Sequence, residues 1–416
     1  MATLHTAIHI ITMIRFINRE MHARKHAVVV LIIAMIAFLA GCGSDQGTEL
    51  EISPMTSSAP TAEPTENPGL KYDGTVICGG SISIDDESID IAGITSAEVS
   101  ELIKMLPYMD SLRTIELGDE ADNTITWEEL YSLEQAAPDV VFNYSFSLYD
   151  KQFTLQSPEM DLSHIKMTDS GELVRRAVRC MQALEYLDMD SCNVGDEDMA
   201  LIRDENPDTH VVWRVWFGEG YTCRTDTIKI LASCPGAAGN LTVSNTKSLK
   251  YCTEVRYLDV GHNEVLHDIS FVAYMPKLEV AILAMAYFTD TTPLANCTNL
   301  EYLEIQTNEI TDLSPLSGLT KLKHLNIGHN FELADITPLY GLTQLERLWV
   351  GCLTKVPQEQ IDEMQRRAPD CVINTTAYDP HDGWRYGQDR YELLIQQFGY
   401  DKGAYSYAWR DPRSYE

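Results

Sequence analysis

The sequence predicts an α/β solenoid, in which short strands from successive repeats stack into a parallel sheet. A first observation is an aliphatic frame of the LxxLxI type that recurs five times between residues 255 and 353. A second is its spacing, because the fourth positions lie 23, 22, 22 and 23 residues apart, at Leu258, Ala281, Leu303, Leu325 and Leu348. A unit of this length cannot bury its own leucines, so neighbouring units must stack.

The two most regular units begin at Leu300 and Leu322 and read LEYLEIQTNEITDLSPLSGLTK and LKHLNIGHNFELADITPLYGLTQ. Asn308 and Asn330 follow the expected strands, as does Asn263 in an earlier unit. An amide at this turn can bond the backbone of an adjacent coil, so these asparagines predict a ladder. The alternative is an amphipathic helical bundle, but the asparagine and the proline-containing connector break the 3.6-residue period that it needs.

This pattern resembles the leucine-rich repeat family, and the connectors DLSPLSGLTKL and DITPLYGLTQL resemble those of its internalin-type bacterial subclass. The resemblance is regular over residues 250–355 and looser over 85–250, where LEYLDMDSCNV from Leu184 and LRTIELGD from Leu112 fit the frame. It implies a solenoid from residue 73 to 375 with an irregular N-terminal half. Helices over 98–105, 172–180 and 358–367 are expected on the convex side.

The N-terminal residues predict export and lipid attachment. Arg24 and Lys25 precede an apolar run of twelve residues, 27–38, which is too short to cross a bilayer as a helix. Leu-Ala-Gly-Cys then ends at Cys42 and resembles the lipobox of bacterial lipoproteins, which implies a lipid on Cys42. The chain would then lie outside the cytoplasm, anchored to the bacterial cell membrane. The alternative is an ordinary signal peptide.

The chain thus divides into a signal peptide within residues 1–41, preceded by an upstream extension, and a polar linker over 42–72. The solenoid follows, and residues 376–416 form a C-terminal region rich in aromatics. This region has two possible roles. It is either a cap in which Leu393, Leu394 and Phe398 close the last coil, or an aromatic ligand-binding tail. Arginines accompany the aromatics, which include Trp384, Tyr391 and Trp409.

Composition excludes several functions. The chain has 62 acidic and 31 basic side chains and a formal charge of −31, which argues against nucleic acid as a partner. The nine cysteines beyond Cys42 form no CxxC pairs, and no cluster has metal-ligand spacing, so neither a cofactor nor a metal is expected. Catalytic motifs such as Gly-x-Ser-x-Gly and HExxH do not occur in the sequence, and no enzyme activity is expected.

Side chains that flank the inward leucines should lie outward on the concave side of the sheet, where we expect them to be exposed. Tyrosine next to an acid recurs there, which suits either a basic protein or peptide segment or, as the alternative, a glycan. Solvated strand residues without a ligand are the third possibility. The candidate ligand-binding residues are Tyr186, Asp188, Tyr257, Asp259, Val280, Ile282, Tyr302, Glu304, His324, Asn326, Arg347 and Trp349.

Overall fold

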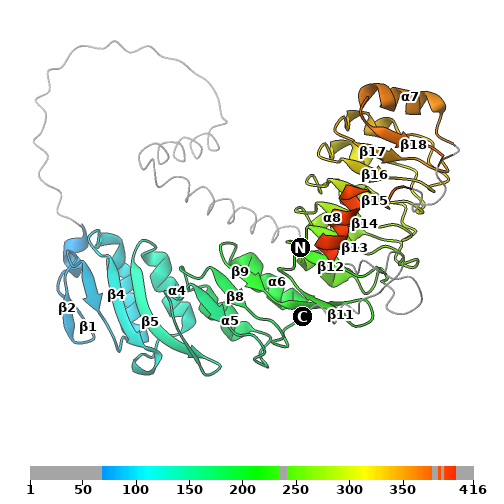
Figure 1. The fold of residues 1–416 in the computed structure, drawn as a ribbon. Helices are drawn as coiled ribbons and strands as arrows, with labels where there is room; N and C mark the ends of the chain where they lie inside the picture. Colours follow the sequence, from blue (N-terminus) through cyan, green and yellow to red (C-terminus); the bar gives the residue numbers. More distant parts are fainter. Residues whose placement is uncertain (1–67, 234–240, 354, 377–382, 386–387, 400–416) are drawn as a thin grey trace, which may run out of the picture. The chain divides into compact units, whose positions relative to one another are not determined.

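The computed structural model describes residues 68–233, 241–353, 355–376, 383–385 and 388–399 (Figure 1). Cys42, the expected signal peptide and Trp409 lie outside the described residues. Among the helices of the described residues, none has the length and apolar character of a membrane span.

The N-terminal half consists of strands that alternate with helices. A short hairpin comes first, formed by β1 (Thr75–Ile77) and β2 (Gly80–Ile82) after the 3-10 helix η1 (Pro68–Tyr72). The next sheet has the order β3-β4-β5-β6, in which the first three strands are parallel and β6 is antiparallel to β5. Its elements are β3 (Ser88–Asp90), α3 (Ser96–Met105), η2 (Leu106–Tyr108), β4 (Thr114–Asp119), η3 (Glu120–Asp122), α4 (Trp127–Ala136), β5 (Val141–Leu148) and β6 (Lys151–Thr154).

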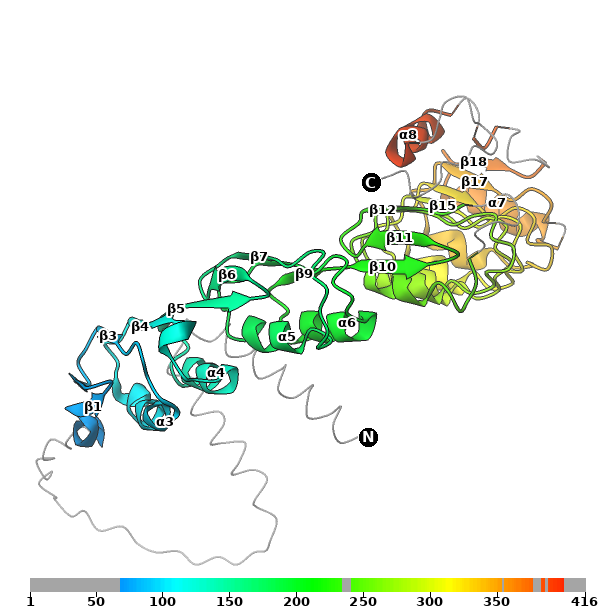
Figure 2. The ribbon, with the colours of Figure 1, turned by 90° about the horizontal axis from the view of Figure 1, so that it is seen from below.

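A second, three-stranded parallel sheet follows, with the order β7-β8-β9. Its elements are β7 (Glu159–Asp161), α5 (Glu172–Val178), β8 (Tyr186–Asp188), α6 (Asp196–Glu205) and β9 (His210–Val212). Figure 2 shows α3 to α6 along one side of these strands. α3 and α4 begin with capping boxes, in which Thr95 pairs with Glu98 and Thr126 with Glu129.

The C-terminal half is a seven-stranded parallel sheet in which every strand has three residues. An antiparallel hairpin of β10 (Arg214–Phe217) and β11 (Tyr221–Arg224) precedes it. The strands are β12 (Lys229–Leu231), β13 (Tyr257–Asp259), β14 (Val280–Ile282), β15 (Tyr302–Glu304), β16 (His324–Asn326), β17 (Arg347–Trp349) and β18 (Val372–Asn374). The helices are η4 (Lys247–Tyr251), η5 (Ser270–Tyr274), η6 (Thr292–Leu294), η7 (Ser314–Gly318), η8 (Thr337–Gly341), α7 (Gln358–Arg367) and α8 (Asp389–Phe398).

The fourth-position leucines of successive repeats are paired with one another in this sheet, as the repeat pattern predicts. Leu303 is paired with Leu325, and Leu325 with Leu348, and all three side chains are fully buried. They belong to one hydrophobic core that runs from Ile77 to Cys371. The fold is therefore a solenoid with a continuous core, and the prediction that the leucines point inward is confirmed.

The predicted asparagine ladder is present and buried. Asn308 Nδ2 donates to the carbonyl oxygens of Leu283 (3.1 Å) and Ile305 (3.0 Å), and its Oδ1 accepts from the backbone N–H of Ala286 at 3.1 Å. Asn330 and Asn263 repeat this arrangement. Each amide therefore ties its own turn to the preceding coil.

Three features of the fold were not predicted from the sequence. The chain after Pro207 is divided at Trp213 into two strands, β9 and β10, because the Trp213 indole is buried and β10 turns to pair with β11. α4 and α6 were not predicted, and neither was β12, whose segment lacks the full leucine frame. The connectors of the regular units are single 3-10 turns, because proline lies in the first turn of η7 and η8.

The C-terminal segment (residues 383–399, of which 383–385 and 388–399 are described) does not close the last coil in the way expected from its leucines. Leu394 and Phe398 are buried against the strands of the seven-stranded sheet, while Leu393 is 43% exposed. α8 thus lies on the strand side of the coils, and α7 lies on the other side (Figure 2). The last coil consists of α7 and β18.

Candidate functional site

The concave face is the side of β12–β18 that points away from the leucine core, and its side chains are those that flank the leucines. Eight of the twelve candidate residues are buried instead of exposed, so the expectation of an open surface was wrong for them. They are Asp259, Val280, Ile282, Tyr302, Glu304, His324, Asn326 and Trp349. Tyr186, Asp188, Tyr257 and Arg347 are partly buried.

The chain's own C-terminal segment buries much of this face. Figure 1 shows α8 next to the strands of the seven-stranded sheet. Tyr391, Leu394, Ile395 and Phe398 of α8 form one apolar cluster with residues of β14, β15 and β17. The spacing of these four side chains is i, i+3, i+4, i+7, which places them on one side of the helix. The cluster on the sheet side consists of Val280, Ile282, Tyr302 and Trp349, with Leu231 and Tyr257 at its margin.

Trp384 fills the centre of the covered area and is fully buried. Its ring centroid lies 5.6 Å from that of Tyr302 and 5.8 Å from that of Trp349, in the latter case edge to face at 74°. The Arg347 guanidinium lies over the same indole, 4.7 Å from its centroid. Aromatic pairs and cation–π contacts of this kind add to the apolar area buried by the indole.

Glu304 is the polar centre of the contact, with no exposed surface. Its Oε1 accepts from the Tyr302 hydroxyl at 2.5 Å and from Trp384 Nε1 at 2.9 Å, and its Oε2 accepts from Gln306 Nε2 at 3.0 Å. The Arg385 guanidinium donates to both carboxylate oxygens, from Nε at 3.2 Å and from Nη2. Glu304 thus binds a tryptophan and an arginine that are adjacent in the sequence.

The charge on Glu304 depends on this arginine. Burial alone would raise the pKa of Glu304, but the Arg385 guanidinium and the hydrogen bonds from Gln306 and Tyr302 outweigh burial and hold the pKa below its usual range. Burial likewise lowers the pKa of Arg385, and the Glu304 carboxylate more than compensates, so that pKa is raised. Both groups are therefore charged at neutral pH, and the contact is a buried ion pair.

Arg347 recognises the backbone of the segment. Its Nη2 donates to the carbonyl oxygen of Gly383 at 2.6 Å and its Nη1 to that of Trp384 at 3.1 Å. Gly383 has a φ of +102° and lies against the Trp349 ring, so this position suits glycine. Two consecutive carbonyls are thus bound by one guanidinium, which is a contact to a peptide main chain.

Three buried polar atoms on the sheet side of this contact have no hydrogen-bond partner in the described part of the chain. They are Gln306 Oε1, His324 Nδ1 and Asn326 Nδ2. Each typically costs about 1–3 kcal/mol when it is left unpaired away from water. The pKa of His324 is lowered to about 4, mainly by burial and to a lesser extent by the positive charge of the nearby Arg347. The His324 ring is therefore neutral at pH 7. The C-terminal segment therefore does not satisfy every group of the face that it covers.

Tyr186 and Asp188 belong to a different sheet and are not brought together with the Tyr302 cluster. Their partner is Arg224, which donates to the Tyr186 hydroxyl at 2.7 Å and to Asp188 Oδ2 at 3.0 Å. Arg224 also bonds Asp226, and Asp190 is held by Arg214 at 2.8 and 2.9 Å. Arg224 thus neutralises Asp188, the acid that was predicted as ligand-binding, and nothing in the repeat frame indicated this arginine.

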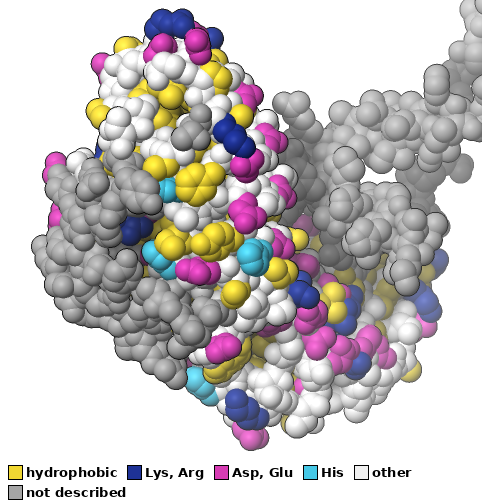
Figure 3. All heavy atoms as spheres, turned by 90° about the vertical axis from the view of Figure 1, so that its right-hand side faces the viewer, with side chains coloured by type: hydrophobic (Ala, Val, Ile, Leu, Met, Phe, Trp, Pro, Cys, Tyr) yellow, Lys and Arg dark blue, Asp and Glu magenta, His cyan; other side chains and the backbone are white. Residues whose placement is uncertain are grey.

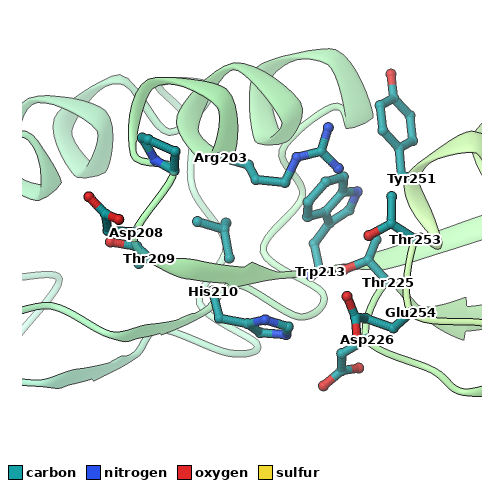
Figure 4. A pocket seen from close by; sticks show the side chains of 12 residues that line it. Arg203, Asp208, Thr209, His210, Trp213, Thr225, Asp226, Tyr251, Thr253 and Glu254 are labelled. Atoms are coloured by element: carbon teal, nitrogen blue, oxygen red, sulfur yellow. Dashed lines mark hydrogen bonds between the residues drawn. The ribbon is translucent and has the colours of Figure 1, made fainter. Parts of the chain in front are cut away.

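A hollow of about 320 Å³ lies at the junction between β9 and the start of the seven-stranded sheet. Figure 4 shows the Arg203 guanidinium beside the Trp213 ring, which it covers at 5.5 Å from the centroid. Asp208, Asp226 and Glu254 also line the hollow. An acidic rim around a covered aromatic ring identifies no ligand by itself, and this hollow is the weaker candidate.

Two further observations concern metals and charge. Within the described ranges, no group of three His, Cys, Asp or Glu side chains is arranged to hold a metal ion. Figure 3 shows acidic side chains spread over one face, with basic ones between them.

Cys252 and Cys297 are fully buried, and the Cys252 sulfur lies 3.7 Å from that of Cys223.

Comparison with known families agrees with the repeat geometry. Residues 298–341 match the model of leucine-rich repeats in two copies, and residues 181–202 match a model of one leucine-rich repeat. The chain contains leucine-rich repeats in these two segments. Solenoids of such repeats characteristically form extended binding surfaces. A comparison of the chain with curated proteins finds no match.

Among solved structures, the chain is similar to bacterial proteins at low identity. An internalin (inlF) from Listeria monocytogenes is 18% identical over 76% of this chain and 92% of its own, with a TM-score of 0.32. An internalin C2 (inlC2) from the same species is 18% identical over 64% and 82%, with a TM-score of 0.30. The Leptospira interrogans protein LIC12759 is 15% identical over 65% and 74%, with a TM-score of 0.31.

Proposed function

We propose that this leucine-rich repeat protein is a non-enzymatic binding module that holds a protein or peptide segment on the concave face of β13–β17. The observation that supports it most is the buried Glu304, which takes an indole and a guanidinium from a segment about 80 residues away in the sequence. A sheet that binds both the main chain and two side chains of one segment has the contacts of a peptide-binding surface.

The partner is proposed to be basic, because the chain carries a formal charge of −31 and its central site accepts an arginine. Complementary charge speeds association and selects against acidic partners. The glycan alternative gains no support from the site. Glu304 is bound by Arg385 and Asp188 by Arg224, and Asp259 is buried and accepts from the Gly261 N–H. None of the three tyrosine–acid pairs therefore presents a carboxylate that is open to sugar hydroxyls.

We further propose that the module is attached to the extracytoplasmic side of a bacterial membrane through a lipid on Cys42. What supports this is the sequence order of charged residues, a short apolar run and Leu-Ala-Gly-Cys. Residues 43–67 would then separate the anchor from the first described element. Two or more acyl chains anchor a protein stably where one does not.

The test of the binding function starts with the mature chain, residues 42–416, used as bait on the native cell envelope and its surroundings. A purified partner is then measured against the wild type, Arg347→Ala and the surface control Arg256→Ala, whose guanidinium binds Glu279 and lies over the Tyr257 ring. Each protein is first cut at a protease site placed at residues 375–382, so that the chain's own C-terminal segment no longer competes for Arg347 through its tether. We expect Arg347→Ala to weaken binding at least tenfold, Arg256→Ala to change it less than about threefold, and salt to weaken it throughout. Equal affinities for all three proteins would move the site off this face.

A further inference from the structure

The described contacts of residues 383–399 follow the pattern of a bound peptide more closely than that of a core element. Its main chain is bound by Arg347, its Trp384 and Arg385 enter one buried site, and its helix lays a single apolar side on the sheet. Helix-in-groove binding with one or two anchoring side chains is a recurrent mode of peptide recognition. The leucine core lies on the other side of the strands and does not include this segment.

The segment has little structure of its own to retain when it leaves the sheet. α8 has ten residues, and isolated helices shorter than about 12–15 residues are marginal in water. Its outward side is polar or exposed at Glu392, Leu393 and Gln396, so it contacts the protein through one side only. Binding and helix formation would therefore occur together.

The covering segment is also an imperfect occupant. Gln306 Oε1, His324 Nδ1 and Asn326 Nδ2 lie buried on the same face without a hydrogen-bond partner in the described ranges. Buried polar groups in native proteins are nearly always paired, so a segment that supplied partners to these three atoms would fit this face better than the described residues of the C-terminal segment. The present occupant also has the advantage of a tether of only eight residues, between Asn374 and Gly383, which gives it a high effective concentration.

We propose, on the basis of the binding function proposed above, that the concave face is a receptor site for a peptide in which an arginine follows an aromatic residue. Residues 383–399 are its tethered resident ligand. An external protein segment of the same chemistry displaces them, with its arginine on Glu304, its aromatic ring between Tyr302 and Trp349, and its main chain on Arg347. The binding site is thus blocked until such a partner competes.

The experiment uses the mature chain, residues 42–416, with a site-specific protease recognition sequence in place of residues 375–382. After cleavage the C-terminal piece is held without a covalent tether, and a fluorescent peptide of residues 383–399 is added while anisotropy is recorded. We expect saturable binding to the cleaved protein and at least a hundredfold weaker apparent binding to the uncut protein, because the tethered copy competes. Circular dichroism should show that the coils remain folded after cleavage.

Specificity is tested on both partners. Glu304→Gln in the cleaved protein should weaken the peptide at least tenfold, while Glu301→Gln should change it less than about twofold, because Glu301 pairs with Lys323 at the surface. Peptides with Trp384→Ala or Arg385→Lys should also bind at least tenfold more weakly, and these variants cannot affect the folding of the protein. A scrambled peptide should not bind.

Three results would overturn the inference. Unfolding of the coils on cleavage would make the segment part of the fold. Failure of the labelled peptide to exchange into a folded, cleaved protein would also make the segment part of the fold. Equal binding of the scrambled or alanine peptides would show that the face has no specificity for an aromatic residue followed by arginine. The proposed function fails in a different way, when an external partner binds and Arg347→Ala leaves its affinity unchanged although the peptide exchanges as expected.

Discussion

Glu304 and Arg385 form an ion pair in which each residue needs the other. The carboxylate has no exposed surface and the guanidinium side chain is 16% exposed. A buried pair of this kind contributes little compared with a well-packed apolar pair, but removal of one partner leaves a buried charge without compensation. The contact therefore contributes specificity for an arginine more than it contributes stability.

Arg385→Ala should release the C-terminal segment from the sheet. The docked state would hold an unpaired Glu304 carboxylate, so we expect docking to weaken by about 3 kcal/mol while the coils stay folded. Limited chymotrypsin digestion, read at Tyr391 and Phe398, should then proceed much faster than in the wild type. Arg366→Ala on α7 is the control, because Arg366 is an exposed partner of Glu363 and should change digestion little. Protected sites in Arg385→Ala would show that the pair does not hold the segment.

His324 makes stability depend on pH. Its folded-state pKa of about 4 lies below the usual 6.5, so the neutral ring is favoured in the folded protein. The stability it contributes is fully present above pH 6.5 and is lost as the pH falls from 6.5 to 4. The charged groups that surround the ring are Arg347 on β17, Arg390 on α8, Lys323, Glu301 and Glu346.

Urea unfolding at pH 7 and pH 5 measures this effect. We expect the wild type to lose about 2 kcal/mol relative to His324→Phe between these pH values, because an imidazolium would be buried beside Arg347. The comparison with the variant is needed because Glu134 acts in the opposite direction. Burial raises the pKa of Glu134 to about 8, so its contribution is present below pH 4.5 and is lost as the pH rises through 8. Parallel pH profiles of the two proteins would contradict a neutral His324.

At the scale of the elements, each coil is joined to its neighbour by two kinds of contact. The three-residue strands pair in parallel register, and the asparagine of the turn bonds the backbone of the preceding coil. Because the strands are so short, the amide contacts form a considerable share of the hydrogen bonds between coils. Their loss leaves backbone groups buried and unpaired.

Asn308→Ala should therefore destabilise the coils by about 2 kcal/mol, because it leaves the Ala286 N–H and the Leu283 carbonyl without their partner. Asn299→Ala is the matched control, since its amide bonds Pro276 and Lys321 at an exposed position and should cost less than about 1 kcal/mol. Urea unfolding of the two variants measures the difference. If both lose the same stability, the ladder does not hold the coils together.

At the scale of the whole molecule, periodicity was the feature that the sequence revealed well. The period of 22 to 23 residues placed Leu303 and Leu325 in the core and Tyr302 and Glu304 on the concave face, and the structure confirms both sides. Local signals also predicted α7 with the bounds 358–367 that are observed. These features depend on residues close to one another in the sequence or at a fixed interval.

The occupied concave face could not be predicted in the same way. Glu304 and Arg385 are 81 positions apart, and no period relates them. The composition of the C-terminal region showed aromatics and arginines, but composition does not indicate which surface they cover. The network of Arg224 with Asp188 was missed for the same reason, since Arg224 lies in a hairpin outside the repeat frame.

The anchoring of the molecule remains a prediction from sequence, and one substitution tests it. Cys42→Ala should leave the precursor uncleaved at that site and abolish lipid incorporation, because the modification requires the Cys42 sulfur. Metabolic labelling with a radioactive fatty acid, together with the size of the chain, measures both effects. A Cys42→Ala chain of mature size that still fractionates with the membrane would point to a different anchor.

The measurement that tests the central claim most directly is hydrogen–deuterium exchange of the wild type and of a Trp384→Ala, Arg385→Ala double variant. The account predicts that the amides of α8 are protected in the wild type and exchange at least tenfold faster in the variant, while the amides of β15 and β16 that lie in the coils keep their protection. Unchanged protection of α8 in the variant, or loss of protection throughout the seven-stranded sheet, would contradict a resident ligand on the concave face.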